Sequence, residues 1–228
     1  MPGGRLVVPL RTRGMTRSWV LRRLGAALGS SGHMTCGFVP VQGAGAHRGR
    51  GIPLLDGDAV GLWLDEGETV DESALSGVLG RPRAEAWTGV TVGPRTFFGD
   101  LDLWLGTRLP GFCLITASQE AIDNGIVALP WMYGTPALVD GKNLAYRARP
   151  RPADSDGELF ELGALAHGPE ADQSARLLAG QITRWDQAGR PSPSLSVHPR
   201  GTPDADLPEG FVLDKKQSRL VISWPAAR

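Results

Sequence analysis

Cysteine and long apolar runs are both scarce in this sequence. Two of its 228 residues are cysteines, Cys36 and Cys113, and no run approaches the roughly 18 apolar residues of a membrane-spanning helix. The N-terminus also lacks the apolar core of a secretion signal, so we expect a cytoplasmic protein with no membrane partner. Both cysteines lie in apolar runs, which favours buried, reduced thiols over a disulfide or a reactive thiol.

Acidic residues are missing from the start of the chain. Overall, 24 basic residues balance 24 acidic ones, so we expect no nucleic-acid partner. Residues 1–23 differ, because they hold six arginines and no acid: Arg5, Arg11, Arg13, Arg17, Arg22 and Arg23. This segment is either a basic arm that binds polyanions or the solvated edge of a strand.

The common catalytic signatures are missing as well. The sequence contains no HExxH, CxxC, G-x-S-x-G or G-x-x-x-x-G-K-[ST] pattern. Residues 43–45 (Gly-Ala-Gly) begin like a dinucleotide-binding loop, but Arg48 stands where its third glycine would fall. The four histidines are far apart and no serine lies on a recognisable nucleophile elbow. We therefore predict no metal site and name no catalytic residue.

Turn residues are abundant and divide the chain into short elements. Apolar runs predict strands at 5–10, 16–24, 34–41, 60–64, 86–92, 111–117, 137–139, 144–147, 159–166, 194–198 and 219–224. Helices are predicted at 71–79, capped by Asp71, and at 97–108, 119–124 and 169–187. Asp140-Gly141 is typical of a hairpin turn, and residues 149–157 form a polar break. A strand, a helix and a strand follow this break, which indicates a mixed α/β unit.

The first ten residues raise the question of what precedes them. Pro2-Gly3-Gly4 is a turn, and residues 5–10 (RLVVPL) read as a buried strand. A strand entered through such a turn commonly follows a helix. Either a domain begins on a bare strand, or its front half is missing.

Two strand motifs resemble the protein-L-isoaspartate O-methyltransferase family. PGGRLVVPL (2–10) is similar to the strand that leaves the last helix of its S-adenosylmethionine-binding, Rossmann-like sheet. CGFVPVQG (36–43) is similar to the F/Y-V-P strand that ends its catalytic fold. LDLWLGTRLPGFCLIT (101–116), AHGPEA (166–171) and residues 201–224 resemble the long C-terminal extension of actinobacterial members, some of which act on ribosomally made peptides.

The resemblance implies an α+β fold in two parts. Residues 1–45 would be the last strands of the methyltransferase sheet, and residues 46–228 a mixed α/β accessory domain with a possible internal break at 149–157. The family transfers a methyl group from S-adenosylmethionine to an aspartyl or isoaspartyl carboxylate of a protein or peptide. Its cofactor loop and active-site Ser/Thr segment precede the PGG strand and are not in this sequence. The expected partners are thus the peptide substrate and a separate catalytic half, and no cofactor is expected for this chain alone.

Two short segments carry the substrate-binding predictions. By resemblance Phe38, Val39 and Pro40 lie beside the substrate, although they are equally well explained as strand core. The glycine-rich loop that follows carries His47, Arg48 and Arg50, which can reach a carboxylate through charged hydrogen bonds or form a plain surface loop. The alternative function is a non-enzymatic module that binds an acidic peptide or partner.

Overall fold

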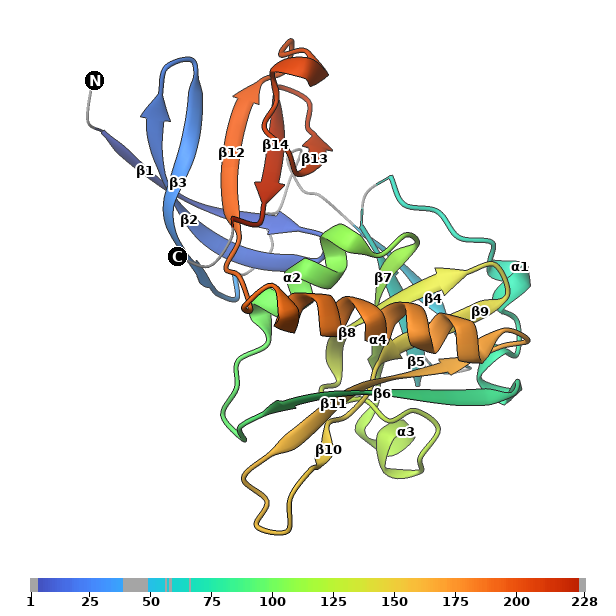
Figure 1. The fold of residues 1–228 in the computed structure, drawn as a ribbon. Coiled ribbons are helices and arrows are strands. Elements are labelled where there is room, and N and C mark those ends of the chain that lie inside the picture. Colours follow the sequence, from blue (N-terminus) through green and yellow to red (C-terminus); the bar gives the residue numbers. More distant parts are fainter. Residues whose placement is uncertain (1–3, 39–48, 56, 58, 66, 226–228) are drawn as a thin grey trace.

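The computed structural model describes residues 4–38, 49–55, 57, 59–65 and 67–225, and its fold is α+β, as predicted (Figure 1). Two sheets carry the strands, and every described strand pair is antiparallel. A Rossmann sheet is mostly parallel, whereas the described strands within residues 1–45 pair antiparallel. The Rossmann-like origin of this segment therefore stays a prediction. Among the described residues no helix has the length and apolar character needed to cross a membrane.

The six-stranded sheet joins the two ends of the chain. Its order is β1 (Arg5–Thr12), β2 (Met15–Leu24), β3 (Ala27–Thr35), β12 (Ser194–Pro199), β14 (Ser218–Ser223) and β13 (Phe211–Asp214). The contact between the two ends is the β3–β12 pair. The domain boundary expected at residue 45 lies outside the described residues, and this sheet takes strands from both sides of it.

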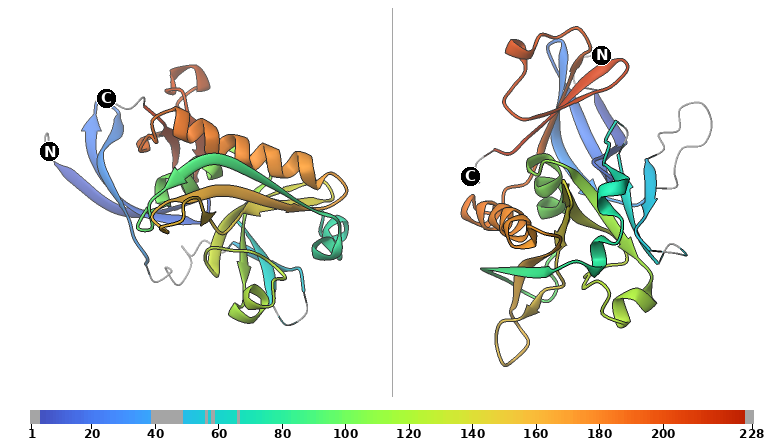
Figure 2. Two further views of the ribbon diagram at one scale, coloured as in Figure 1. Left: turned by 60° about the horizontal axis from the view of Figure 1, so that its bottom comes forward. Right: turned by 90° about the vertical axis from the view of Figure 1, so that its right-hand side faces the viewer.

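The second sheet forms the body of the molecule. Its order is β10 (Arg151–Pro152), β11 (Phe160–His167), β9 (Asn143–Arg147), β8 (Tyr133–Asp140), β7 (Phe112–Ala117), β5 (Val60–Leu64) and β4 (Arg50–Pro53), and β6 (Arg83–Val92) pairs with β11. The β8–β9 hairpin confirms the turn expected at Asp140-Gly141. Figure 2 shows the N-terminal strands projecting from this body.

Helices cover both faces of the second sheet. One face packs against α4 (Ala171–Gln187) and α2 (Gly99–Arg108), and the other against α1 (Glu72–Leu75), η2 (Val78–Gly80) and α3 (Gln119–Asp123). The remaining short helix is η3 (Asp204–Asp206). Helix α2 belongs to two cores, because Leu101 and Leu105 face the second sheet whereas Leu103 packs with Trp19 of the six-stranded sheet. This helix therefore ties the two sheets together.

Two predictions about the N-terminal strands are wrong. The strand expected at 34–41 overlaps only the end of β3, which stops at Thr35, because the turn at Gly25 (φ 62°) brings the chain back onto β2 earlier. Residues 36–38 form no strand, and residues 39–41 lie outside the described residues. The strand at 5–10 is not buried but forms an edge of its sheet, with Val7 62% exposed. Pro9 explains this position, since proline lacks the N–H that a central strand needs. The sequence also failed to predict β4, β13 and β10, the last of which lies within the expected polar break at 149–157 and pairs with β11.

Candidate functional site

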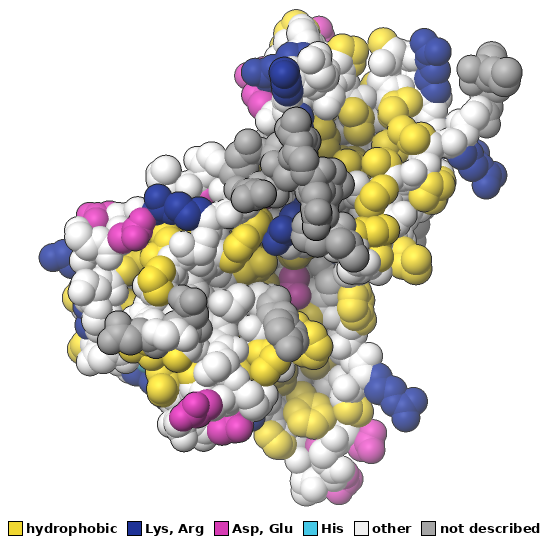
Figure 3. All heavy atoms as spheres, turned by 180° about the vertical axis from the view of Figure 1, so that it is seen from behind, with side chains coloured by type: hydrophobic (Ala, Val, Ile, Leu, Met, Phe, Trp, Pro, Cys, Tyr) yellow, Lys and Arg dark blue, Asp and Glu magenta, His cyan; other side chains and the backbone are white. Residues whose placement is uncertain are grey.

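The outward surface of β1–β3 is apolar. Side chains alternate along a strand, so Val8 and Leu10 pack against the core while Val7 and Pro9 point the other way. Val7 lies opposite Val20, and Pro9 and Met34 both lie opposite Ser18. We call the surface made by Val7, Pro9, Val20, Leu24 and Met34 the N-terminal face. Figure 3 shows apolar side chains gathered over these strands.

Exposure is high across the N-terminal face. Val7, Leu24 and Met34 are 62%, 66% and 67% exposed, and Phe38, just after β3, is 48% exposed. Arg5 lies directly opposite Arg22 on the same surface, and neither has an ion-pair partner among the described residues. Like charges directly opposite each other destabilise a strand pair. An acidic partner would remove this repulsion while covering the apolar side chains.

Three of the four remaining N-terminal arginines, Arg11, Arg13 and Arg17, attach the β1–β2 hairpin to the body. Arg11 stacks over Trp63 of β5, with its guanidinium carbon 4.1 Å from the ring centre. Arg13 and Arg17 are buried, and both donate to backbone oxygens of helix α2, at Gly106 and Gly99. The basic segment is therefore neither a free arm nor only a solvated edge, because half of its arginines hold the hairpin in place.

Arg13 lies at the tip of the hairpin in a left-handed conformation (φ 52°), followed by Gly14 (φ 79°). Two positive φ angles in a two-residue connection are typical of a type I′ turn, in which Asn or Gly is the usual first residue. The side chain compensates for this, since Arg13 Nε donates to Gly106 O at 2.8 Å and Nη1 pairs with Glu68. Its guanidinium also stacks on Phe112 and Phe211, 5.2 and 5.3 Å from the ring centres.

A second set of charges lies where the two sheets meet. We call Arg17, Asp100, Asp102 and Arg147 the junction cluster; they come from β2, α2 and β9. Arg17 Nη1 lies 2.8 Å from Asp100 Oδ1, and Arg147 Nε lies 3.2 Å from Asp102 Oδ1. The Arg147 guanidinium also stacks on Phe98 at 4.7 Å. Both arginine side chains are nearly enclosed, at 3% and 4% exposed, whereas Asp100 and Asp102 reach solvent at 27% and 21%.

Burial sets the protonation behaviour of this region. Burial raises the pKa of the Asp102 carboxyl above its ordinary value, and the nearby Arg147 and Arg17 only partly oppose this. Burial also lowers the pKa of the Arg17 guanidinium. The pKa of His33, whose Nδ1 lies 2.9 Å from Arg17 Nη1, is lowered by burial and by the charge of Arg17. At neutral pH His33 is therefore a neutral neighbour of a charged arginine.

Hydrogen bonding in the junction cluster is incomplete. Arg17 Nε, Arg147 Nε and Nη1, Asp102 Oδ1 and Thr35 Oγ1 are buried and have no hydrogen-bond partner among the described residues. The 3.2 Å contact between Arg147 and Asp102 is an ion pair without the alignment of a hydrogen bond. Most buried polar atoms in proteins have a hydrogen-bond partner. Four buried atoms of the junction cluster and one of Thr35, which lies opposite Arg17 in the β2–β3 ladder, have none among the described residues, so this region has spare capacity for hydrogen bonds.

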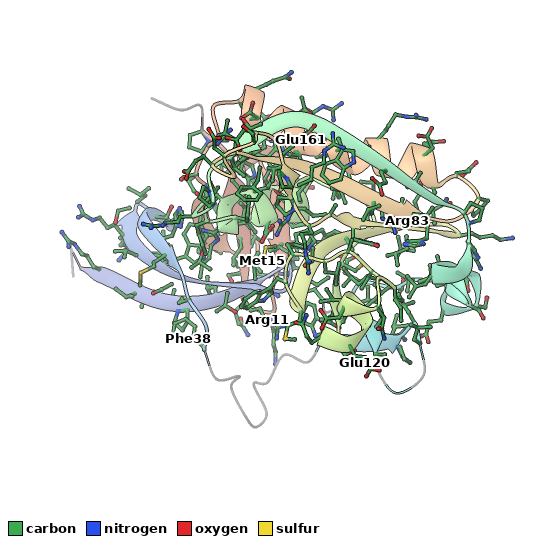
Figure 4. All side chains as sticks on the ribbon, turned by 90° about the horizontal axis from the view of Figure 1, so that it is seen from below. Arg11, Met15, Phe38, Arg83, Glu120 and Glu161 are labelled. Carbon is green, nitrogen blue, oxygen red and sulfur yellow. The ribbon has the colours of Figure 1, made fainter. Side chains whose placement is uncertain are left out.

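The sequence-predicted site residues are only partly described. Val39, Pro40, His47 and Arg48 lie outside the described residues, whereas Phe38 and Arg50 lie within them. Figure 4 places Phe38 beside the N-terminal strands, and Arg11 and Met15 where these strands meet the body. Arg50 is exposed on β4 and already forms an ion pair with Glu72 of α1.

A cavity lies beside this Arg50–Glu72 pair. Its volume is about 480 Å³, and its lining includes Ile52, Leu54, Glu72 and Leu75. The cavity is apolar on the β4 side and carries one carboxylate, so it can accept an apolar side chain of an extended peptide. Whether Arg50 contacts a peptide there stays a prediction.

No residue pattern in the sequence predicted the junction cluster. Asp102 interrupts the apolar face of the predicted helix at 97–108, and Arg147 ends an apolar strand, so each is a charged residue within a buried run. Such residues are seldom enclosed unless they are paired, and this was the available signal. Their pairing with each other depends on the sheets meeting at α2, which local pattern does not reveal.

Neither a metal site nor a comparison with known proteins assigns a function to these residues. The described part of the chain contains no group of three or more His, Cys, Asp or Glu side chains placed to hold a metal ion. Cys36 and Cys113 are both free thiols. Cys113 is buried, as expected, whereas the prediction that Cys36 is buried is wrong, because it is only half-buried. Comparison of the chain with protein-family models, with curated proteins and with solved structures found no match.

Proposed function

We propose that this chain is the C-terminal part of a carboxyl methyltransferase similar to the protein-L-isoaspartate O-methyltransferases. In this proposal it holds the peptide substrate, and a separate catalytic half supplies the S-adenosylmethionine site and the reacting groups in the cytoplasm. The observation that supports it is the exposed N-terminal face. This face lies on the three strands that follow the PGG motif, where the resemblance to the methyltransferase core is found.

The N-terminal face has the chemistry of an interface rather than of a free surface. Valine, leucine and methionine side chains gain roughly 1.5–3 kcal/mol each on full burial, so covering Val7, Leu24 and Met34, which are already partly buried, is worth on the order of 3–5 kcal/mol. Large apolar patches on a protein surface commonly mark interaction sites. Of the ten exposed large apolar residues described, four lie at or next to this face: Val7, Leu24, Met34 and Phe38.

The Arg5–Arg22 pair indicates which kind of partner the face can bind. A second copy of the chain would bring another Arg5–Arg22 pair to the interface, and like charges are unfavourable there. We therefore propose that the catalytic half covers the face with apolar side chains and places a carboxylate near Arg5 and Arg22. Pro9 has no N–H, so backbone pairing along the outer edge of β1 would be interrupted there.

The arginines at the end of the hairpin that meets the body give this interface a role in catalysis. Arg11, Arg13 and Arg17 fix the hairpin to the body, so a catalytic half docked on the N-terminal face is also oriented toward the rest of the chain. The cavity beside Arg50 would then hold a side chain of the same peptide whose aspartyl group is methylated. Orienting a substrate in this way is a large part of what an enzyme contributes.

The proposal is tested by supplying the missing half. The catalytic half of a methyltransferase of this family is added in trans or fused in cis, and transfer of a labelled methyl group to an aspartyl peptide is measured. We expect activity only when both parts are present, and a loss of at least tenfold with Val7→Asp combined with Met34→Asp. Thr183→Asp, on helix α4, is the matched control. Peptide binding without any methylation in both arrangements would instead favour the non-enzymatic binding module.

A further inference from the structure

We propose that the junction cluster is a binding site for a carboxylate, the chemistry of an acidic peptide side chain. Its donors are Nη1 of Arg147 and Nε of Arg17, which have no hydrogen-bond partner among the described residues, and Nε of Arg147, which has only its misaligned ion pair with Asp102. That the carboxylate belongs to a peptide rests on the proposed function, whereas the presence of an anion site does not. The site does not include Arg50, the described residue of the loop that the sequence suggested.

The donors are held in place before any ligand arrives. The Arg147 guanidinium lies between Asp102 and the ring of Phe98, and Arg17 is fixed by Asp100 and by Gly99 O. Both side chains are more than nine-tenths buried. A fixed guanidinium loses little entropy on binding, and paired N–H groups match the two oxygens of a carboxylate.

Access to the site runs past helix α2. The side chains of Asp102 and Asp100 are partly exposed, whereas the donor nitrogens are buried, so a ligand must displace these two side chains to reach the donors. Thr35 lies opposite Arg17 in the β2–β3 ladder and adds an unpartnered hydroxyl. Phe38 follows only three residues later. The cluster thus lies near the segment that, by resemblance, borders the substrate.

The charges balance if Asp102 is protonated. With two arginines and two ionised aspartates the cluster is neutral, and a bound carboxylate would face the Asp102 carboxylate. Burial raises the pKa of Asp102, so its carboxyl can hold a proton and donate it in a hydrogen bond to the ligand. Asp100 stays available to Arg17 and accepts from Ser192 Oγ at 2.7 Å.

The experiment uses the intact chain and a small probe. Arginine Nε–Hε resonances are recorded by NMR on protein labelled with ¹⁵N-arginine, while N-acetyl-aspartate N-methylamide is added. N-acetyl-asparagine N-methylamide, which has the same shape without the charge, is the matched control. We expect saturable shifts of the Arg17 and Arg147 resonances with a Kd on the order of 1 mM, and no shifts with the asparagine compound. Arg219, paired with Asp204 and Asp214 on β14, reports nonspecific effects.

A charge-preserving variant gives the second measurement. Arg147→Lys keeps the charge and removes the planar fork, so binding should weaken at least tenfold, whereas Arg184→Lys on helix α4 should leave it unchanged. Equal responses to the aspartate and asparagine probes in the unaltered protein would overturn the proposal, whether or not Arg147→Lys folds. Carboxylate binding without methylation in the reconstituted system would leave the site standing and refute the proposed function alone.

Discussion

Removing the Arg13 side chain should release the β1–β2 hairpin from the body. Three kinds of interaction are lost in Arg13→Ala: a hydrogen bond, an ion pair and stacking on two aromatic rings. A hydrogen bond from a charged donor to Gly106 O is worth about 1.5–3 kcal/mol. The pair with Glu68, whose side chain is 35% exposed, adds less than about 1 kcal/mol after solvent screening. Stacking on Phe112 and Phe211 adds about 0.5–1 kcal/mol each. Because all of these involve one guanidinium they are not additive, and we expect a loss of about 3 kcal/mol.

The backbone of Arg13 provides a matched comparison. Its left-handed conformation costs about 1–2 kcal/mol for any residue with a Cβ atom, and glycine escapes that cost. Arg13→Gly loses the same side-chain interactions as Arg13→Ala but relieves this strain. The glycine variant should therefore be about 1 kcal/mol more stable than the alanine variant. The neighbouring Gly14→Ala should be strongly destabilising, since an added Cβ would lie 2.5 Å from Leu114 Cδ1.

Equilibrium unfolding in urea, followed by circular dichroism, measures both differences. The free energy of unfolding is obtained by linear extrapolation, and an unchanged m-value is required for comparison between variants. A loss below 1 kcal/mol in Arg13→Ala would show that the guanidinium does not hold the hairpin. A glycine variant less stable than the alanine variant would show that the turn is not strained.

Three further results are expected. Ellman's reagent should label one thiol in the folded protein and none in Cys36→Ser, because burial raises the pKa of Cys113 to about 12 while Cys36 is only half-buried; two fast-reacting thiols would contradict this. Burial, the largest cause, lowers the pKa of both His33 and His167 below the ordinary 6.5, so their contribution to stability is present above that pH and is lost as the pH falls. The urea midpoint of unfolding should therefore decrease as the pH drops from about 7.5 to 5.5, and a flat or rising midpoint would refute this prediction. Val7→Asp with Met34→Asp should change the free energy of unfolding of the isolated chain in urea by only about 0.5 kcal/mol, whereas a large loss of stability would mean that the face is already covered.

Local signals in the sequence predicted most elements of the body. Asp71 caps α1 by accepting from the N–H groups of Ser73 and Ala74 at 3.0 and 3.2 Å, as its position before the helix indicated. Helices α2 and α4 were predicted because their apolar residues recur at helical spacing. Each of these signals acts within a few residues, so it does not depend on how the sheets are arranged.

The N-terminal strands were harder to predict because their environment is set by distant parts of the chain. The run RLVVPL is as apolar as a central strand, yet it lies at an edge. Its burial depends on which strands pair with β2 and β3, and β12 comes from more than 150 residues later. Glycines at 29 and 32 also conceal the alternation of β3, since they add no side chain to either face.

The charged residues show the same limit more clearly. Arg5, Arg13 and Arg17 share a basic segment without any acid, so composition treats them alike. In the folded protein Arg5 faces solvent beside Arg22, whereas Glu68 and Asp100, which arrive from the body, bind Arg13 and Arg17. A charged side chain is enclosed only where the fold supplies a partner, and neither partner is a neighbour in sequence. Arg5 and Arg22 are therefore exposed on the outer face of the hairpin, whereas Arg17 is enclosed on its inner face and Arg13 at its tip.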